Sequence, residues 1–126
     1  MVLHIKTAWM LAGLGALAAC GHDAENAALQ HAAMGDARHG AHVIRRVGCG
    51  SCHSIPGIRG AHGRVGPPLD SFADRDFIAG RVPNTPDNLV LWLESPPSLE
   101  PATAMPVLGL DENAARDVAA YLYSLD

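Results

Sequence analysis

Lysine is almost absent from this chain of 126 residues: Lys6 is the only one, against eight arginines and 13 acidic residues. The formal net charge of −4 argues against nucleic acid as a partner, because phosphates attract proteins with basic patches. Aromatic residues are also scarce, at 5%. A chain of this length is expected to form one small domain, whose core is marginal unless a bound group helps to fill it.

The longest uncharged run lies near the N-terminus, where residues 8–19 follow the cation Lys6. It is shorter than the roughly 20 apolar residues that a membrane-spanning helix needs. Residues 1–19 are therefore predicted to be a secretory signal peptide. The stretch LAAC that ends at Cys20 resembles the lipobox of bacterial lipoproteins, which implies that Cys20 is lipidated and becomes the first residue of the mature protein.

An ordinary signal peptide with a chance cysteine and an uncleaved anchor are the alternatives. Without Lys6, the mature chain has eight arginines against 13 acidic residues, a formal charge of −5, which argues against electrostatic adsorption to anionic lipid. Attachment to a membrane would then depend on the acyl chains. Residues 20–35 are predicted to be a lipidated N-terminus and flexible tether, and residues 36–126 the folded domain.

Three segments have the signals of helices. The first, residues 36–48, starts with the possible cap Asp36 and contains Gly40, which suggests close approach by another element. The second, within residues 84–95, has Thr85 as a cap, and the third follows Asp111.

Two long connections separate these helices. Residues 54–84 are dense in proline and glycine, so no strand is expected there, and residues 96–109 are also expected to be irregular. Loops of this length suggest a chain wrapped around something other than its own side chains.

The stretch VGCGSCHSIPG at residues 47–57 contains the C-x-x-C-H signature of covalent heme attachment. Each thiol adds to a heme vinyl group and forms a thioether, and the residue after the second cysteine brings its imidazole to the iron. Cys49 and Cys52 are therefore predicted to hold one heme c, with His53 as the proximal iron ligand.

Other interpretations of the two cysteines fit less well. A redox dithiol of the thioredoxin type needs a strand before the motif and a helix after it, whereas here a helix precedes the motif. A structural zinc site needs a further ligand pair, and no later cysteine follows Cys52. A plain disulfide leaves His53 unexplained.

A six-coordinate iron needs a second axial ligand, for which Met105, Met34 and the other histidines are candidates. Met105 is favoured, since it lies in a proline-stiffened loop just before the last helix, whereas Met34 lies in the predicted tether. His39 and His42 could share a metal, but residues of this kind usually belong to a solvated helix face.

The order of a helix, CGSCH, GPPL, a middle helix, TAMP and a terminal AAYLYSL resembles the class I cytochromes c over residues 36–126. The resemblance implies an all-α fold, in which three to four helices wrap around one covalently bound heme with long irregular loops. It implies that the backbone carbonyl of Pro67 accepts the N–H of the axial histidine. It also implies that Arg75 and Trp92 bind the heme propionates.

In this family a glycine of the first helix packs against an aromatic residue of the last, and Gly40 and Tyr121 match these positions. One departure is the ring of lysines through which mitochondrial members dock, because this domain has none. Docking would instead use Arg59, Arg64 and Arg81, or an apolar rim at the exposed heme edge.

These features predict an electron carrier rather than an enzyme: a membrane-tethered monoheme cytochrome, anchored by lipid in a bacterial periplasm. Expected partners are a reductase or dehydrogenase upstream and an oxidase or periplasmic enzyme downstream, and no nucleic acid. The main alternative is a heme-bearing electron-transfer subunit of a larger membrane oxidase or dehydrogenase complex. A peroxidase or gas sensor is a third hypothesis, which requires a vacant sixth iron position.

Overall fold

The computed structural model describes residues 35–125. The predicted signal peptide, the lipidation of Cys20 and the tether lie outside these residues, apart from Gly35. Among the described residues, none of the helices has both the length and the apolar character needed to cross a membrane.

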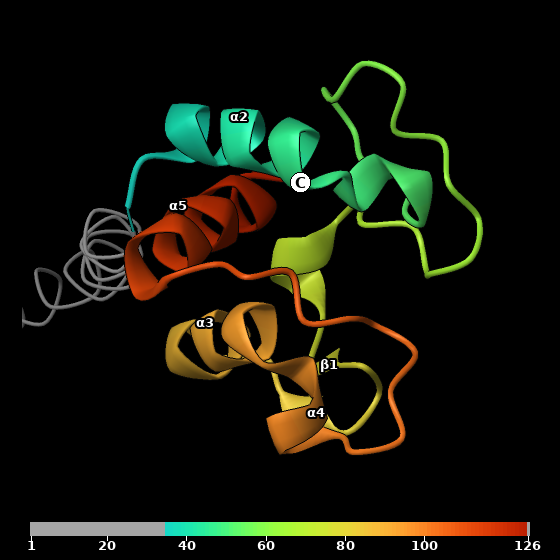
Figure 1. The fold of residues 1–126 in the computed structure, drawn as a ribbon, viewed down its shortest axis with the longest axis vertical. Helices are drawn as coiled ribbons and strands as arrows, with labels where there is room; N and C mark the ends of the chain where they lie inside the picture. The colour runs from blue at the N-terminus through green and yellow to red at the C-terminus, as the bar shows by residue number, and fades with distance from the viewer. Residues whose placement is uncertain (1–34, 126) are drawn as a thin grey trace, which may run out of the picture.

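Helices dominate the described part of the chain, as predicted. Its α-helices are α2 (Ala37–Val47), α3 (Pro86–Glu94), α4 (Pro96–Leu99) and α5 (Glu112–Tyr123). Helix α2 packs against α5, and α3 packs against both α5 and α4 (Figure 1). The long connections 48–71 and 100–110 leave these helices on the same side, to the right in Figure 1.

The three long helices begin at the side-chain caps that the sequence indicates. The carboxylate of Asp36 accepts hydrogen bonds from the backbone N–H groups of Arg38 and His39. Thr85 and Asp111 cap α3 and α5 in the same way. Each cap satisfies backbone donors that have no partner within the first helical turn.

Short elements of secondary structure lie where the sequence predicted irregular chain. Residues 54–84 contain a small antiparallel pair, β1 (Phe77–Ile78) and β2 (Val82–Pro83). Strands of two residues are too short to show an alternating pattern, and here they flank a turn with positive φ angles at Ala79 and Gly80. Helix α4, a single turn, begins with two prolines, which are well tolerated at the start of a helix.

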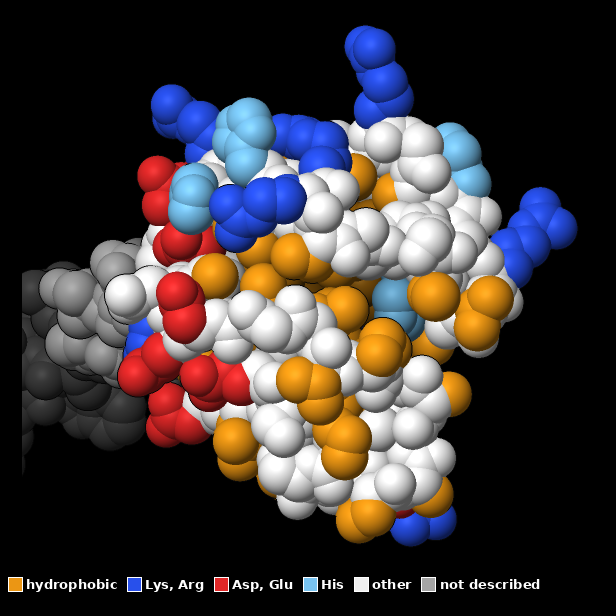
Figure 2. Space-filling view, in the orientation of Figure 1, with side chains coloured by type: hydrophobic (Ala, Val, Ile, Leu, Met, Phe, Trp, Pro, Cys, Tyr) orange, Lys and Arg blue, Asp and Glu red, His pale blue; other side chains and the backbone are white. Residues whose placement is uncertain are grey.

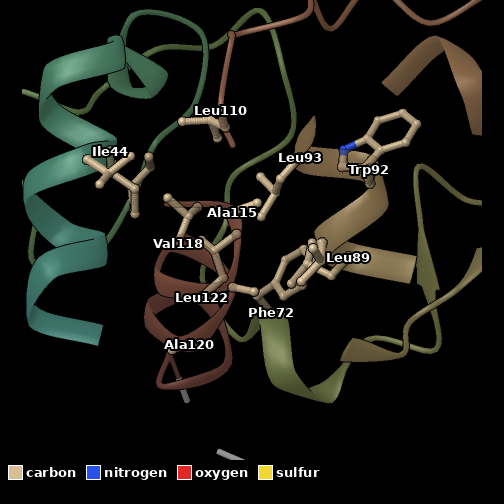
Figure 3. Packing of buried hydrophobic residues seen from close by; sticks show 14 of the residues in the cluster. Ile44, Phe72, Leu89, Trp92, Leu93, Leu110, Ala115, Val118, Ala120 and Leu122 are labelled. Carbon is tan, nitrogen blue, oxygen red and sulfur yellow. The ribbon is translucent and has the colours of Figure 1, made fainter. Parts of the chain in front are cut away.

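The core lies where α2, α3 and α5 meet. Ile44 from α2 and Val118 from α5 face each other in Figure 3, and both are 1% exposed. Leu89 and Leu93 of α3 lie on the other side of α5, close to Phe72. The buried residues of α3 and α5 therefore lie on the faces that these helices turn toward the core.

Gly40 lies where α2 crosses α5, and it explains how closely these helices approach. A Cβ atom at this position would lie 2.0 Å from the backbone oxygen of Asp117. The predicted close approach is confirmed, but the nearest atoms belong to the α5 backbone rather than to Tyr121. Tyr121 lies one turn later and donates a hydrogen bond of 2.7 Å to the carbonyl of Pro56.

We expect Gly40→Ala to lower the free energy of unfolding of the mature protein by about 1–3 kcal/mol, the usual range for overpacking. Helix propensity alone would act in the opposite direction, adding about 1 kcal/mol. Chemical denaturation measures the difference, with Arg46→Ala on the exposed face of α2 as the control. A variant more stable than the wild type would contradict the close contact with Asp117.

Candidate heme site

The C-x-x-C-H motif forms one tight turn at the end of α2. The helix stops at Gly48, whose left-handed φ of 81° turns the chain into the 3₁₀ turn η1 (Cys49–Ser51). The backbone N–H groups of Cys52 and His53 then both donate to the carbonyl of Cys49, at 3.2 and 3.0 Å. Both thiols and the imidazole therefore come from a single turn, as a covalently attached heme requires.

Both cysteines are free thiols of intermediate burial. Burial raises the pKa of the Cys49 thiol above its usual value, and the neighbouring Cys52 adds to this shift. A redox dithiol instead needs a lowered thiol pKa, and a helix after the motif rather than before it. The geometry therefore gives the dithiol interpretation no support.

The ring of His53 is oriented by a hydrogen bond between its Nδ1 and the carbonyl oxygen of Pro67, at 2.7 Å. A carbonyl can only accept, so Nδ1 carries the proton, and Nε2 keeps the free lone pair. This is the arrangement by which proteins orient a metal-binding imidazole and make it a better donor. The carbonyl that the family resemblance indicated is thus the one that the histidine contacts.

Glycines allow the following loop to pack directly on this motif. A Cβ at Gly66 would lie 2.3 Å from Cε1 of His53, and one at Gly63 would lie 2.4 Å from the carbonyl carbon of Cys52. Gly63 donates a backbone hydrogen bond to Gly50 at 3.1 Å, and Gly66 donates one to Cys52 at 2.9 Å. The loop therefore supports the attachment turn through backbone hydrogen bonds as well as through the bond from His53 to Pro67.

Met105 is half-buried and packs against the hydrophobic core. Its backbone N–H donates to Oγ1 of Thr103 at 3.1 Å, which fixes the start of the Met105–Pro106 segment. Figure 2 shows hydrophobic side chains gathered on the middle and right of the visible face, around a histidine side chain. An apolar surface of this kind suits the hydrophobic faces of a porphyrin.

Arg75 and Trp92, the two predicted propionate partners, are placed differently. The Nη2 of Arg75 donates to the carbonyls of Pro68 and Asp70, at 2.6 and 2.8 Å, so Nη1 and Nε are its remaining donor atoms. Trp92 is 8% exposed at the edge of the core (Figure 3), and no described residue accepts a hydrogen bond from its indole N–H. Both side chains therefore keep donors for a carboxylate.

Both helix histidines, His39 and His42, are exposed on α2. His39 lies 2.6 Å from Asp117, and the Nδ1 of His42 accepts a hydrogen bond from Arg45 at 3.0 Å. No group of three or more potential metal-ligating side chains is found in the part of the chain that the structure describes.

Sequence reasoning missed several residues that shape the site. The GPPL stretch contains Gly66 next to Pro67, but nothing in the sequence indicates that this glycine packs on the His53 ring. Thr103 precedes the methionine by two residues, a spacing at which a hydroxyl can bond the backbone, so T-A-M-P carried that signal. Asn84, which fixes the backbone of Arg75, gave no signal, because its partners lie at least nine residues away.

These residues fit a covalently attached heme. They provide two reduced thiols on one turn and an imidazole with its free lone pair on Nε2. The connection 100–110, which contains Met105, lies on the same side of the helices as this turn (Figure 1). Gly66 lets the loop approach the His53 ring so closely that any side chain at this position would overlap it.

Comparisons with known proteins agree with this geometry. The sequence model of the cytochrome c family matches residues 37–126 of this chain. The chain is 34% identical over 100 residues to a cytochrome c-type protein named cyt cy from Rhodobacter capsulatus, covering 72% of this chain and 50% of that protein. It is 33% identical over 90 residues to cytochrome c oxidase subunit 2 of Alkalihalophilus pseudofirmus, covering 71% of this chain and 25% of that subunit.

This chain therefore belongs to the cytochrome c family, in its class I form, with one covalently bound heme c. It spans about a quarter to a half of the length of these relatives. No solved structure matches it. Family membership supports electron transfer as its activity.

We expect Gly66→Ala to disturb the proximal imidazole, because the added Cβ would overlap Cε1 of His53. The mature protein should keep its covalent heme but show an altered ferric spectrum and lower stability, by about 1–3 kcal/mol if the overlap is relieved by local shifts. Visible spectra and denaturation measure both effects.

The control is Val65→Ala, which changes a neighbouring side chain that is 82% exposed. A Gly66→Ala protein with the spectrum and stability of the wild type would show that the loop does not press on the histidine ring.

Proposed function

We propose that this domain is a monoheme electron carrier in which Cys49 and Cys52 attach the heme and His53 and Met105 are the axial ligands. The hydrogen bond from His53 to Pro67 is the main support, since it leaves Nε2 as the donor atom. Heme supplies a one-electron Fe(III)/Fe(II) couple, and a thioether ligand favours the reduced form.

The protein's own contribution is to hold these groups still. The attachment turn is fixed by hydrogen bonds to Cys49, the imidazole by Pro67, and the methionine backbone by Thr103. Little has to move when the charge at the site changes. With both axial positions taken by side chains, no position is left for a substrate, which favours a carrier over a peroxidase or a gas sensor.

The ligand assignment is tested with Met105→Ala in the mature, heme-loaded protein. We expect the heme to stay attached, while the far-red sulfur-to-iron band disappears and the iron becomes high-spin or binds added imidazole. Met34→Ala is the matched control and should leave the spectrum unchanged. A sulfur-to-iron band that persists in Met105→Ala would show that the assignment is wrong. Loss of the band in Met34→Ala would then assign the ligand to Met34.

Arginines provide the basic surface through which this lysine-free domain would meet a partner. Arg59 and Arg64 are exposed and have no acidic partner among the described residues, whereas Arg81 lies 3.4 Å from Glu100. Helix α2 adds three more exposed arginines and no acidic residue. In Figure 2, basic side chains gather along the top and acidic ones on the left.

Exposed apolar side chains lie in the same loops as two of the proposed heme-binding residues. Val65, 82% exposed, is two residues before Pro67, and Val107, 59% exposed, is two residues after Met105. A contiguous exposed apolar patch is typical of an interaction surface, and hydrophobic side chains gather on the face shown in Figure 2. An apolar rim with nearby arginines suits a brief encounter with an acidic redox partner.

We expect the double variant Arg59→Glu/Arg64→Glu to slow electron transfer with an anionic reductant, because steering by charge is lost. The rate at which hexacyanoferrate(II) reduces the ferric protein should fall about ten-fold at low ionic strength, and the difference should shrink as salt is added. Stopped-flow absorbance measures both rates.

The control is Arg81→Glu/Arg116→Glu, which changes the net charge equally but at arginines that already face Glu100 and Glu112. An equal loss of rate in both double variants would show that net charge alone, and not this surface, controls the reaction.

The proposal includes a lipid tether at Cys20 that holds the domain at a membrane in the periplasm. Its support is the LAAC stretch after an uncharged run. A periplasmic or otherwise extracytoplasmic location is usual for bacterial c-type cytochromes.

The second candidate function is a heme-bearing subunit of a larger membrane oxidase or dehydrogenase complex. It is favoured by the similarity to cytochrome c oxidase subunit 2 of Alkalihalophilus pseudofirmus and of Bacillus sp. PS3. Mild detergent extraction separates the two: a stoichiometric partner indicates a subunit, and a single heme protein indicates a free carrier.

A further inference from the structure

The segment that presents Pro67 to His53 is unusual in how it is held. Its N–H groups at Gly66 and Leu69 donate to Cys52 and Ser54, at 2.9 and 2.8 Å. Between them lie two prolines, which have no N–H to donate. The backbone in the middle of this segment can therefore form hydrogen bonds only through its carbonyl oxygens.

A single side chain takes the carbonyl of Pro68 and a second carbonyl just beyond this segment. Nη2 of Arg75 donates to Pro68 at 2.6 Å and to Asp70 at 2.8 Å, one residue and three residues beyond the carbonyl that His53 uses. The guanidinium carbon also lies 5.4 Å from the centre of the Phe72 ring. Phe72 is only 5% exposed, so the arginine stacks on a ring that is itself fixed in the core.

The backbone of Arg75 is held just as firmly. Nδ2 of Asn84 donates to the carbonyls of Phe72 and Arg75, at 3.0 and 2.9 Å, and its Oδ1 accepts from the hydroxyl of Tyr123 at 2.7 Å. Burial raises the pKa of Tyr123 to about 12, so the hydroxyl keeps its proton at neutral pH. Arg75 is thus tied to the end of α5.

We propose that Arg75 is a positioning residue for the proximal histidine: it holds the carbonyls of Pro68 and Asp70 and so fixes where Pro67 accepts the hydrogen bond from His53. This inference rests on the proposed role of His53 as an iron ligand. It differs from propionate binding, which would use the remaining donors, Nη1 and Nε.

The chemistry explains why the position of this carbonyl matters. A hydrogen bond to Nδ1 sets the rotation of the imidazole and its strength as a donor through Nε2. A lysine at position 75 keeps the positive charge for a propionate, but its side chain ends one bond short of where Nη2 donates to both carbonyls, and it has no planar group to stack on Phe72. Charge and positioning can therefore be separated by substitution.

The experiment compares Arg75→Lys and Arg75→Gln in the mature, heme-loaded protein by electron paramagnetic resonance of the ferric form. The g-values report the orientation and strength of the axial ligands, which a purely stabilising contact would not change. We expect both variants to shift the g-values in the same direction. The Arg75→Gln protein should also have a lower reduction potential, because it loses the positive charge.

Arg116→Lys is the matched control, because that guanidinium pairs with Glu112 at the surface and should give wild-type g-values. Asn84→Asp is a second test that keeps the arginine and removes the Nδ2 donor that holds its backbone; its g-values should shift in the same direction by a smaller amount. Thermal melting of each variant records any loss of stability separately.

Wild-type g-values in Arg75→Lys would overturn the inference, whether or not Arg75→Gln changes the potential, since only the charge would then matter. His53→Ala, measured in parallel, tests the proposed function itself. If that variant keeps the wild-type ferric spectrum, His53 is not the ligand and both proposals fail. If it loses the spectrum while Arg75→Lys is unchanged, only the role of Arg75 is refuted.

Discussion

The hydrogen bond between Nδ1 of His53 and the carbonyl of Pro67 is the contact on which the site depends. It decides the tautomer of the imidazole and leaves Nε2 as the only ring atom that can act as a donor to a metal. The neighbouring structure serves to keep both partners in place. The attachment turn fixes one end of the bond, and the loop that follows fixes the other.

In this small domain with few aromatic residues, close packing of backbone segments keeps His53 and Pro67 in place. At Gly40, Gly63 and Gly66, a Cβ would lie within 2.5 Å of a neighbouring atom. At the first of these positions α2 meets α5, and at the other two the loop meets the attachment turn. Side chains add long-range ties between the same regions, such as the bond from Tyr121 to Pro56 and that from Tyr123 to Asn84.

Much of the fold and the site could be predicted, because the responsible signals are local. The caps Asp36, Thr85 and Asp111 lie next to the helices that they start. The C-x-x-C-H motif needs only five consecutive residues to specify its chemistry. The short strands β1 and β2 and the single turn α4 were missed, since elements of two to four residues leave no periodic pattern.

The sequence by itself determined the three long helices, the attachment turn and the family resemblance, all of which follow from neighbouring residues. Only the tertiary structure decided that Gly40 meets the backbone of Asp117, that Arg75 holds Pro68 and Asp70, and that Asn84 and Tyr123 hold Arg75 in turn. Such contacts join residues that are far apart in the chain or reach around prolines. Their partners depend on how the helices pack, and no local spacing encodes that arrangement.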